Sequence, residues 1–331
     1  MGAVDSPTDL APEVREGGVA RRLDQQLERR LECLPAGHPS APDYADRHRA
    51  ADRVRPFTDA EHAEHVADIK VRLAAAHDAG LASEDQHTID PDHEFWSPDR
   101  EAAHDVLLSE LYDRAASVPC EHKAVVAGGL AGAGKTTVLR EFAGIALSEY
   151  LTINPDEIKA EMARNGLVPE IDGLTPMEAT ELVHEESSHL AKRLARIAQA
   201  DGKNVMWDVT MSKAGSAEQR IEALRAGGYT RVDGIFVDTA VDVAARRADA
   251  RHREGHEAYR AGEGLGGRFL SQELIQAQAD GTSGSVNRAN FERVKHSFDA
   301  WARYGNSADG PPVLVATSAE PWEPAGARED L

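Results

Sequence analysis

The sequence contains little cysteine and no long apolar run. Cys33 and Cys120 are its two cysteines, and they lie too far apart for the C-x-x-C spacing of a zinc ribbon. A disulfide framework is not indicated either, and we expect a protein of the reducing cytoplasm. No stretch reaches the roughly 18 consecutive apolar residues of a membrane span, so no membrane partner is expected.

Basic residues are scarce relative to acidic ones. The 331 residues include 37 Lys and Arg against 57 Asp and Glu, which gives a formal net charge of −20. A surface of this sign repels a phosphate backbone, so we expect no nucleic-acid partner. A small anionic ligand remains compatible with this charge, because a pocket can be basic inside an acidic surface.

The chain is predicted to have three parts. Residues 1–60 are expected to form a mobile or helical N-terminal extension, with leucines at helical spacing over 21–34. Residues 61–119 are expected to be a helical region that packs on the third part, residues 120–331. A helix is predicted over 59–79.

Short apolar runs alternate with helical segments in the third part. This alternation predicts a parallel sheet with helices on both faces. Strands are predicted at 124–127, 150–153, 205–207, 232–237 and 313–316, and helices at 136–147, 155–165, 175–200, 216–226, 241–253 and 287–304. Upstream, Ser97 and Pro98 are typical of an N-cap and a first helical position, so a helix is expected from there to about residue 116.

The sharpest motif is Gly-Leu-Ala-Gly-Ala-Gly-Lys-Thr at residues 129–136. It matches G-x-x-x-x-G-K-[ST] between a predicted strand and a predicted helix, the context of a phosphate-binding loop. Loop amides and the helix start would bind phosphate, the lysine would reach the β and γ phosphates, and the threonine hydroxyl would bind Mg²⁺. ATP and Mg²⁺ are therefore expected, bound by Gly129, Gly132, Ala133, Gly134, Lys135, Thr136 and Thr137. The expected fold is a three-layer α/β sandwich of the P-loop kinase type, preceded by helices.

Two aspartates are predicted at the carboxyl ends of neighbouring parallel strands, where ligands bind in such sheets. Asp156 follows the second predicted strand and is a candidate general base for phosphoryl transfer. Asp208 follows the third and is a candidate Mg²⁺ ligand. The alternatives are that Asp156 caps the next helix and that Asp208 is a turn residue.

Basic side chains are concentrated at residues 246–253. Arg247 and Arg251 would share one helix face, and arginines on a lid neutralise a phosphoryl group during transfer. Arg268, after a glycine-dense loop, is expected to join them. A solvated helix face is the alternative.

Two histidine patterns do not predict a metal site. His184 and His189 are one position further apart than H-E-x-x-H requires, so they would diverge on a helix. His62 and His65 lie three positions apart with no further ligand near them in the sequence. We interpret this second pair as solvated.

Residues 120–317 resemble the zeta toxin family, the P-loop kinases that include UDP-N-acetylglucosamine kinase. The resemblance rests on the phosphate loop, Asn-Pro-Asp-Glu-Ile-Lys at 154–159, Asp-Val-Thr at 208–210, the arginine-rich segment, Gly-Gly-Arg-Phe-Leu at 266–270, and the stretch 301–307. It implies transfer of the γ-phosphate of ATP to a hydroxyl of a small molecule such as a UDP-N-acetylsugar. It also implies a toxin that is held inactive by an antitoxin.

The resemblance implies a role for each matching residue. Asp156 is similar to the catalytic base, and Lys135, Arg251 and Arg268 are expected to act with it; Arg247 is the other candidate for the ATP-side arginine. Glu185, Glu186, Asp208 and Thr210 are the expected substrate contacts, and Thr136 and Asp208 the Mg²⁺ ligands. Ser212 stands where the family pattern has a substrate-holding arginine.

The acceptor and the enzymatic activity have alternatives. Chloramphenicol phosphotransferases use a related scaffold for another alcohol, so an antibiotic or nucleoside kinase is one of them. A nucleotide-binding regulatory module without kinase activity is another, suggested by the helical extension. Residues 1–120 together are acidic, with 25 acidic against 13 basic residues, and this helical segment is a candidate for blocking the ATP site in cis in place of an antitoxin.

Overall fold

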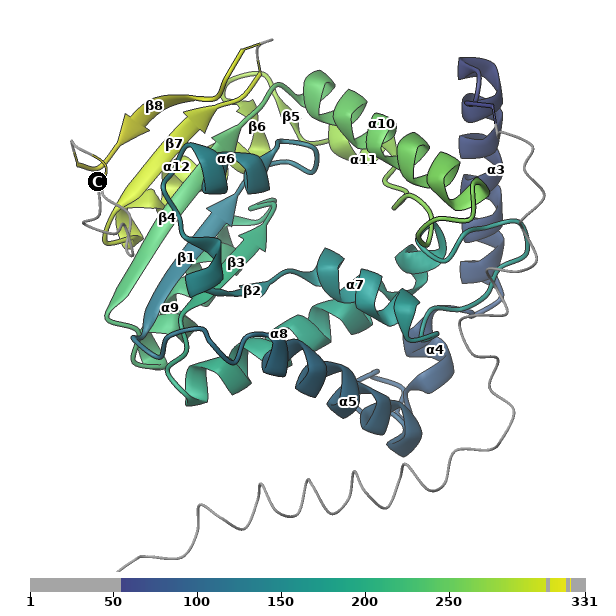
Figure 1. Ribbon diagram of the computed structural model, residues 1–331, viewed down its shortest axis with the longest axis horizontal. Coiled ribbons are helices and arrows are strands. Elements are labelled where there is room, and N and C mark those ends of the chain that lie inside the picture. The colour runs from purple at the N-terminus through teal and green to yellow at the C-terminus, as the bar shows by residue number, and fades with distance from the viewer. Residues whose placement is uncertain (1–54, 308–309, 320–321, 323–331) are drawn as a thin grey trace, which may run out of the picture. The chain divides into compact units, whose positions relative to one another are not determined.

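The computed structural model describes residues 55–307, 310–319 and 322. The helix predicted at 21–34 lies outside these residues, as does most of the extension predicted over 1–60. The described residues form an α/β fold around one large sheet (Figure 1). None of the helices within the described residues is both long and apolar enough to span a bilayer.

The central sheet has six strands in the order β2-β3-β1-β4-β7-β8. Pairing is parallel from β2 through β7, whereas β8 runs antiparallel to β7. The prediction of a wholly parallel sheet is therefore corrected at one edge. The strands are β1 Lys123–Gly128, β2 Leu151–Ile153, β3 Val205–Val209, β4 Arg231–Asp238, β7 Trp301–Gly305 and β8 Val313–Thr317; β5 Ala279–Asp280 and β6 Gly284–Ser285 form a separate hairpin.

The predicted helix over 287–304 was wrong in its second half. Only Val286–Val294 is helical, as α12, and Trp301–Gly305 is strand β7. Ala302 and Tyr304 are buried while their neighbours are half-buried, which is the two-residue period of a strand. Five residues carry too short a pattern to reveal this period without the β4 edge on which they pair.

Helices cover both faces of the sheet, as predicted. The helices of the described residues are α3 Asp59–Asp78, α4 Ser83–His87, α5 Pro98–Arg114, α6 Lys135–Glu141, α7 Pro155–Arg164, α8 His184–Ala200, α9 Ala214–Ala226, α10 Val241–Arg260, α11 Gln272–Gln276 and α12, with short 3₁₀ turns η1 Leu147–Glu149, η2 Ala179–Val183 and η3 Lys295–Ser297.

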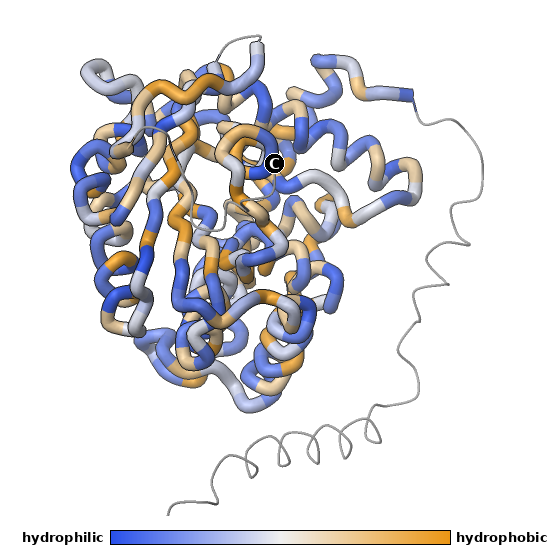
Figure 2. The backbone as a smooth tube through the Cα atoms, turned by 60° about the vertical axis from the view of Figure 1, so that its left-hand side comes forward, coloured by the Kyte–Doolittle hydropathy of each residue, from blue (hydrophilic) through white to orange (hydrophobic). Residues whose placement is uncertain are grey.

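The residues of β1 alternate between two hydrophobic cores. Ala124 and Val126 face the core shared with α5, α8, α9 and α12, while Val125 and Ala127 face the core shared with α6 and α10. All four side chains are fully buried. Figure 2 shows the hydrophobic stretches following the central strands, whereas the helices carry hydrophobic and hydrophilic residues in turn. A strand buried on both faces needs this apolar continuity.

The helices before the sheet are held by local caps and by burial. Thr58 and Glu61 form a capping box at the start of α3, and Ser97 caps α5 with Pro98 at its first position, as predicted. Ile69 and Leu73 of α3 pack against Leu182 of η2 in a third, smaller core. Residues 59–78 thus pack directly on the part of the chain that follows β1.

Candidate active site

The phosphate-loop motif forms a tight turn between β1 and α6. Gly132 and Gly134 both have φ of 82°, a left-handed conformation that glycine adopts at no steric cost. A Cβ atom on Gly132 would lie 2.2 Å from the carbonyl oxygen of Ala244. Both the conformation and the close approach of α10 therefore require glycine. The turn ends at the N-terminus of α6, and helix N-termini favour bound phosphate.

Lys135 connects the loop to the neighbouring strand. Its Nζ donates to the carbonyl oxygen of Gly129 at 3.0 Å and lies 3.3 Å from Oδ1 of Asp208. Asp208 is placed there by β3, which pairs in parallel with β1 and brings Asp208 opposite Ala127. Neighbouring strands therefore bring the two charges together.

Asp208 has an environment that suits a divalent cation. Burial raises the pKa of its carboxyl, and the ammonium group of Lys135 opposes this rise. The Asn154 amide donates to its Oδ2 at 3.2 Å. Asp208 and the Thr136 hydroxyl line the same cavity and offer oxygen ligands, the type that Mg²⁺ prefers. These residues fit a bound Mg²⁺.

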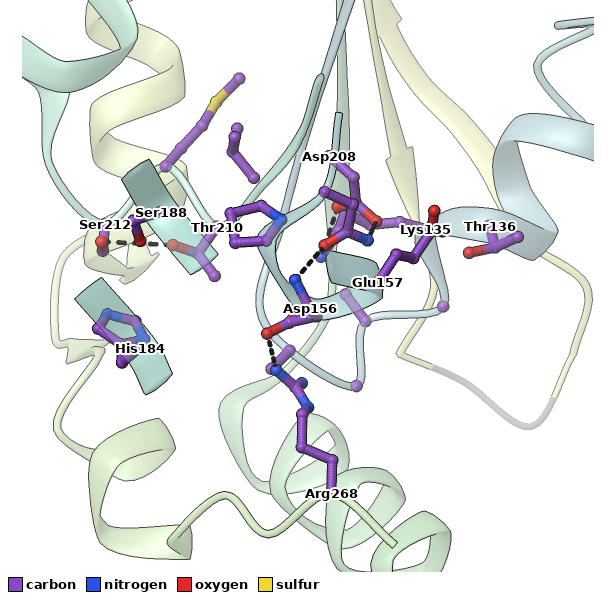
Figure 3. Close-up of a pocket in the computed structure, with 18 of the residues that line it drawn as sticks. Lys135, Thr136, Asp156, Glu157, His184, Ser188, Asp208, Thr210, Ser212 and Arg268 are labelled. Carbon is purple, nitrogen blue, oxygen red and sulfur yellow. Dashed lines mark hydrogen bonds and ion pairs between the residues drawn. The ribbon is translucent and has the colours of Figure 1, made fainter. Parts of the chain in front are cut away.

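Asp156 lies in the first turn of α7, directly after β2. Asn154 is the N-cap of this helix and accepts from the Asp156 amide at 2.9 Å, so Asn154 rather than Asp156 is the cap. The Asp156 side chain instead forms an ion pair with Arg268 (Figure 3). The loop after α10 and the carboxyl end of β2 thus meet at Asp156.

A cavity of about 520 Å³ collects most of the predicted site. Of the predicted residues, those that line it are Gly132, Ala133, Gly134, Lys135, Thr136, Thr137, Asp156, Asp208, Thr210, Arg251 and Arg268. Figure 3 shows two groups of side chains, with Lys135, Thr136 and Asp208 on one side and His184, Ser188, Thr210 and Ser212 on the other. Asp156 lies between them.

Four predicted residues do not line the cavity. Gly129 underlies the loop through its bond to Lys135. Arg247 donates to the Asn306 carbonyl oxygen at 3.0 Å, and the Asn306 side chain in turn donates to Ala133 of the loop. Arg247 is therefore one residue removed from the phosphate loop, whereas Arg251 reaches the cavity.

Glu185 and Glu186 are the other two predicted site residues that do not line the cavity. Glu185 is exposed on α8, outside the cavity. Glu186 has no exposed surface and is bound by Arg100 at 2.6 and 2.8 Å and by His104. These contacts tie α5 to α8, so they replace the predicted substrate contact at Glu186 with a structural ion pair.

Arg220 is a cavity residue that the sequence did not reveal. It lies two turns into α9, and its guanidinium sits 4.4 Å from the ring centroid of Trp207. Burial lowers its pKa to about 10, and among the described residues no carboxylate forms an ion pair with it. An arginine is thus available near Ser212, supplied by the helix instead of the loop.

The side of the cavity opposite the phosphate loop is rich in hydrogen-bonding groups. Thr210 donates to Ser212 at 3.3 Å, and Lys159 Nζ lies 3.1 Å from Nδ1 of His184. Burial lowers the pKa of both Lys159 and His184. The sequence did not predict the pairing of Lys159 with His184, because this pairing depends on the packing of α7 against α8.

A model of the Zeta toxin family matches residues 110–302. No curated protein matches the chain. The fold is similar to a solved complex described as AvrRxo1-ORF1:AvrRxo1-ORF2 with sulphate ions, with 18% identity, a TM-score of 0.54, and coverage of 70% of this chain and 72% of that one. A structure of AvrRxo1-ORF1:-ORF2 with ATP is similar at 20% identity and a TM-score of 0.51, covering 67% and 68%.

Proposed function

Because the chain belongs to the zeta toxin family, we propose that it is an ATP-dependent phosphotransferase acting on a hydroxyl group of a small molecule. The observation that carries the proposal is the convergence of Lys135, Asp208 and Asp156 on one cavity at the carboxyl ends of β1, β3 and β2. Nucleotide, metal ligand and base then occupy the crevice where such sheets bind ligands.

ATP is assigned to the phosphate-loop side. The loop amides and Lys135 hold the β and γ phosphates, and Arg251 and Arg268 add positive charge from α10 and the loop that follows it. Thr136 and Asp208 would hold Mg²⁺, and the ion would offset the negative charge of the phosphate groups. The similar AvrRxo1-ORF1:-ORF2 structure, which was solved with ATP, supports this nucleotide.

Asp156 is the proposed general base. It removes the proton of the acceptor hydroxyl as that oxygen bonds to the γ-phosphorus and the bond to the β-phosphate oxygen breaks, releasing ADP. Its position between the two groups of Figure 3 supports this role. Arg268, already paired with Asp156, would shift to the transferring phosphoryl group.

The opposite side favours an anionic, hydroxyl-rich acceptor. Arg220 and Lys213 supply positive charge, and Thr210, Ser188 and Ser212 supply hydroxyl groups. A nucleotide sugar such as a UDP-N-acetylsugar has this chemistry, and we propose it ahead of an uncharged antibiotic or nucleoside.

The test is a transfer assay with γ-labelled ATP and a panel of acceptors. Labelled product is expected with nucleotide sugars and not with neutral alcohols of similar size. ATP binding without any labelled product would instead favour the regulatory module. Product formed only from neutral alcohols would keep the phosphotransferase and reject the nucleotide sugar.

We further propose that the enzyme is a toxin controlled by an antitoxin or by its own residues 1–60. The similar AvrRxo1-ORF1:AvrRxo1-ORF2 structure pairs two proteins, which supports a partner for this chain. None of the described residues before β1 lines the cavity, so any block in cis is assigned to the extension itself. Growth arrest by the active enzyme, absent with Asp156→Asn, is the expected phenotype.

A further inference from the structure

Four histidines gather where α3 meets α10, and none of them lines the cavity described above. His62 and His65 come from α3, and His252 and His256 come from α10. His62 is 6% exposed and His252 only 2%. The interpretation of His62 and His65 as solvated was therefore wrong, because α10 supplies the partners that the local sequence lacked.

The carboxylate of Glu178 lies at the centre of this cluster. Its Oε1 is contacted by His65 Nε2 at 2.8 Å, His256 Nδ1 at 2.8 Å and His252 Nε2 at 2.9 Å. Its Oε2 accepts from the Thr175 amide at 2.8 Å. One carboxylate oxygen thus meets three imidazole nitrogens.

Glu178 is a buried carboxylate whose contacts are histidines and a backbone amide. Its side chain has no exposed surface, and among the described residues no lysine or arginine pairs with it. Buried carboxylates are found paired with a cation or bound to a metal ion, and a metal ion shared with the imidazoles would supply that partner here.

We propose that His65, His256 and Glu178 form a binding site for a divalent transition-metal ion of the zinc class. Their ligand atoms lie within 4.8 Å of one another. Two ligand atoms on one tetrahedral zinc ion are about 3.3 Å apart. Side-chain movements of about 0.5 Å would therefore separate the two imidazole nitrogens from Oε1 of Glu178 enough to admit the ion. Two imidazoles and a carboxylate are a ligand set for zinc, and water completes the fourth position.

The surrounding residues fit the outer shell of such a site. His252 and the Thr175 amide hold the carboxylate, as second-shell groups hold metal ligands elsewhere. Phe57 stacks on His256 with ring centroids 5.0 Å apart and covers the cluster. His65 and His256 keep 15% and 10% of their side-chain surface exposed, which leaves an entry path.

A second group of potential ligands serves as a contrast. Glu101, His104 and His189 are equally close together. There, however, Arg193 pairs with Glu101, and Arg100 lies beside His104 through Glu186. These guanidinium groups already balance the carboxylates and would repel a cation.

The ion would join α3 to the elements that carry the lid arginines. His252 directly follows Arg251, and a Cβ atom on Gly267, next to Arg268, would lie 2.0 Å from the His252 carbonyl oxygen. The Met177 amide, next to Glu178, donates to Leu265 at 3.1 Å. Metal binding would therefore stiffen the support of both arginines.

The experiment uses the full chain without a histidine tag, stripped with a chelator and kept in excess Mg²⁺ but without ATP. Titration with Zn²⁺ is expected to show one ion per chain and to raise Tm on the order of 5 °C at a 100-fold excess over Kd. Co²⁺ is expected to bind there with the visible absorption of a four- or five-coordinate ion. Because no nucleotide is present, the result is independent of phosphotransfer.

Variants decide where the ion binds. His65→Gln and His256→Gln should each weaken Zn²⁺ binding more than about tenfold, and His252→Ala should weaken it about 10- to 100-fold through Glu178. His189→Gln is the matched control and should bind as the parent does. If His256→Gln does not fold, the partly exposed His65 carries the test. Absence of Zn²⁺ binding, unchanged binding in His65→Gln, or loss in His189→Gln would each overturn the proposal.

Discussion

Arg268 and Asp156 form an ion pair that joins the loop after α10 to the first turn of α7. The lid arginine therefore lies directly on the carboxylate that we propose as the base. In the proposed mechanism, an incoming phosphoryl group attracts Arg268 away before Asp156 accepts a proton. The position of Arg268 would then determine whether the Asp156 carboxylate can act as the base.

Asp156→Asn should lower kcat by about 10² to 10⁴ while leaving the Kd for ATP nearly unchanged, because a general base acts only in the chemical step. The comparison variant is Glu157→Gln, the adjacent carboxylate of the same cavity, which should have a smaller effect. Steady-state kinetics and calorimetric titration with ATP measure the two quantities. A normal kcat in Asp156→Asn would contradict the assignment of Asp156 as the general base.

Lys135→Ala should weaken ATP binding by about 10- to 100-fold, the equivalent of losing one charge-assisted hydrogen bond. Lys192→Ala, on the exposed surface of α8, is the control and should bind ATP as the parent does. Titration calorimetry in Mg²⁺ decides the outcome. Equal affinities in the two variants would place the nucleotide elsewhere.

Arg220→Ala should raise KM for an anionic acceptor by about tenfold or more and leave KM for ATP unchanged. Arg220→Lys should restore only part of the effect, since lysine keeps the charge but loses the planar stacking on Trp207. Arg225→Ala on the same helix removes an ion pair with Asp299 and should leave both KM values unchanged. A rise in KM for ATP would argue against an acceptor role.

The depressed pKa of buried Glu186 predicts that part of the free energy of unfolding is lost at acid pH. Burial raises its pKa, but hydrogen bonds from His104 and Arg100 outweigh this and hold the pKa at about 2, below the ordinary 4.5. Because the folded-state pKa is depressed, the stabilisation is complete above about pH 4.5 and is lost as pH falls towards 2. It amounts to about 3 kcal/mol.

The measurement is urea unfolding of the parent chain and Glu186→Gln across this range. The difference in free energy of unfolding should be largest near pH 7 and shrink below about pH 4.5. Arg100→Ala should destabilise at neutral pH by about 3–5 kcal/mol, because it leaves a buried charge unpaired. A difference between parent and Glu186→Gln that does not change with pH would contradict the ion-pair assignment.

Deletion of residues 1–54 tests self-inhibition. If this segment blocks the ATP site, turnover should rise by about 5- to 150-fold, the usual range of a coupling free energy. The capping box at Thr58 and the contacts of α3 are kept, so Tm should change little. Unchanged turnover would leave inhibition to a separate antitoxin.

Local signals predicted much of the fold. The phosphate loop, the alternation of strands and helices, and the start of α5 at Ser97 and Pro98 all depend on neighbouring residues, and the structure has them where they were expected. Strand β7 was missed, because its two-residue period spans only five residues and its pairing partner is remote in sequence.

Only some of the site residues were predicted from the sequence, again because the others depend on partners that are remote in sequence. Lys135, Asp156 and Asp208 follow strand ends, and parallel pairing brings strand ends to one edge. Glu186 and Arg220 lie on helices, where orientation decides the role. Only the rotation of α8 towards α5 makes Glu186 a partner of Arg100, and only the packing of α9 on β3 brings Arg220 to the cavity.

The sequence by itself determined the phosphate-loop chemistry and the layered α/β architecture, since both arise from short-range patterns of glycine, charge and apolar spacing. The tertiary structure alone decided which distant charged groups meet. Glu178 and its histidines come from three separate segments, and the energy of a buried carboxylate depends on neighbours that no local pattern specifies.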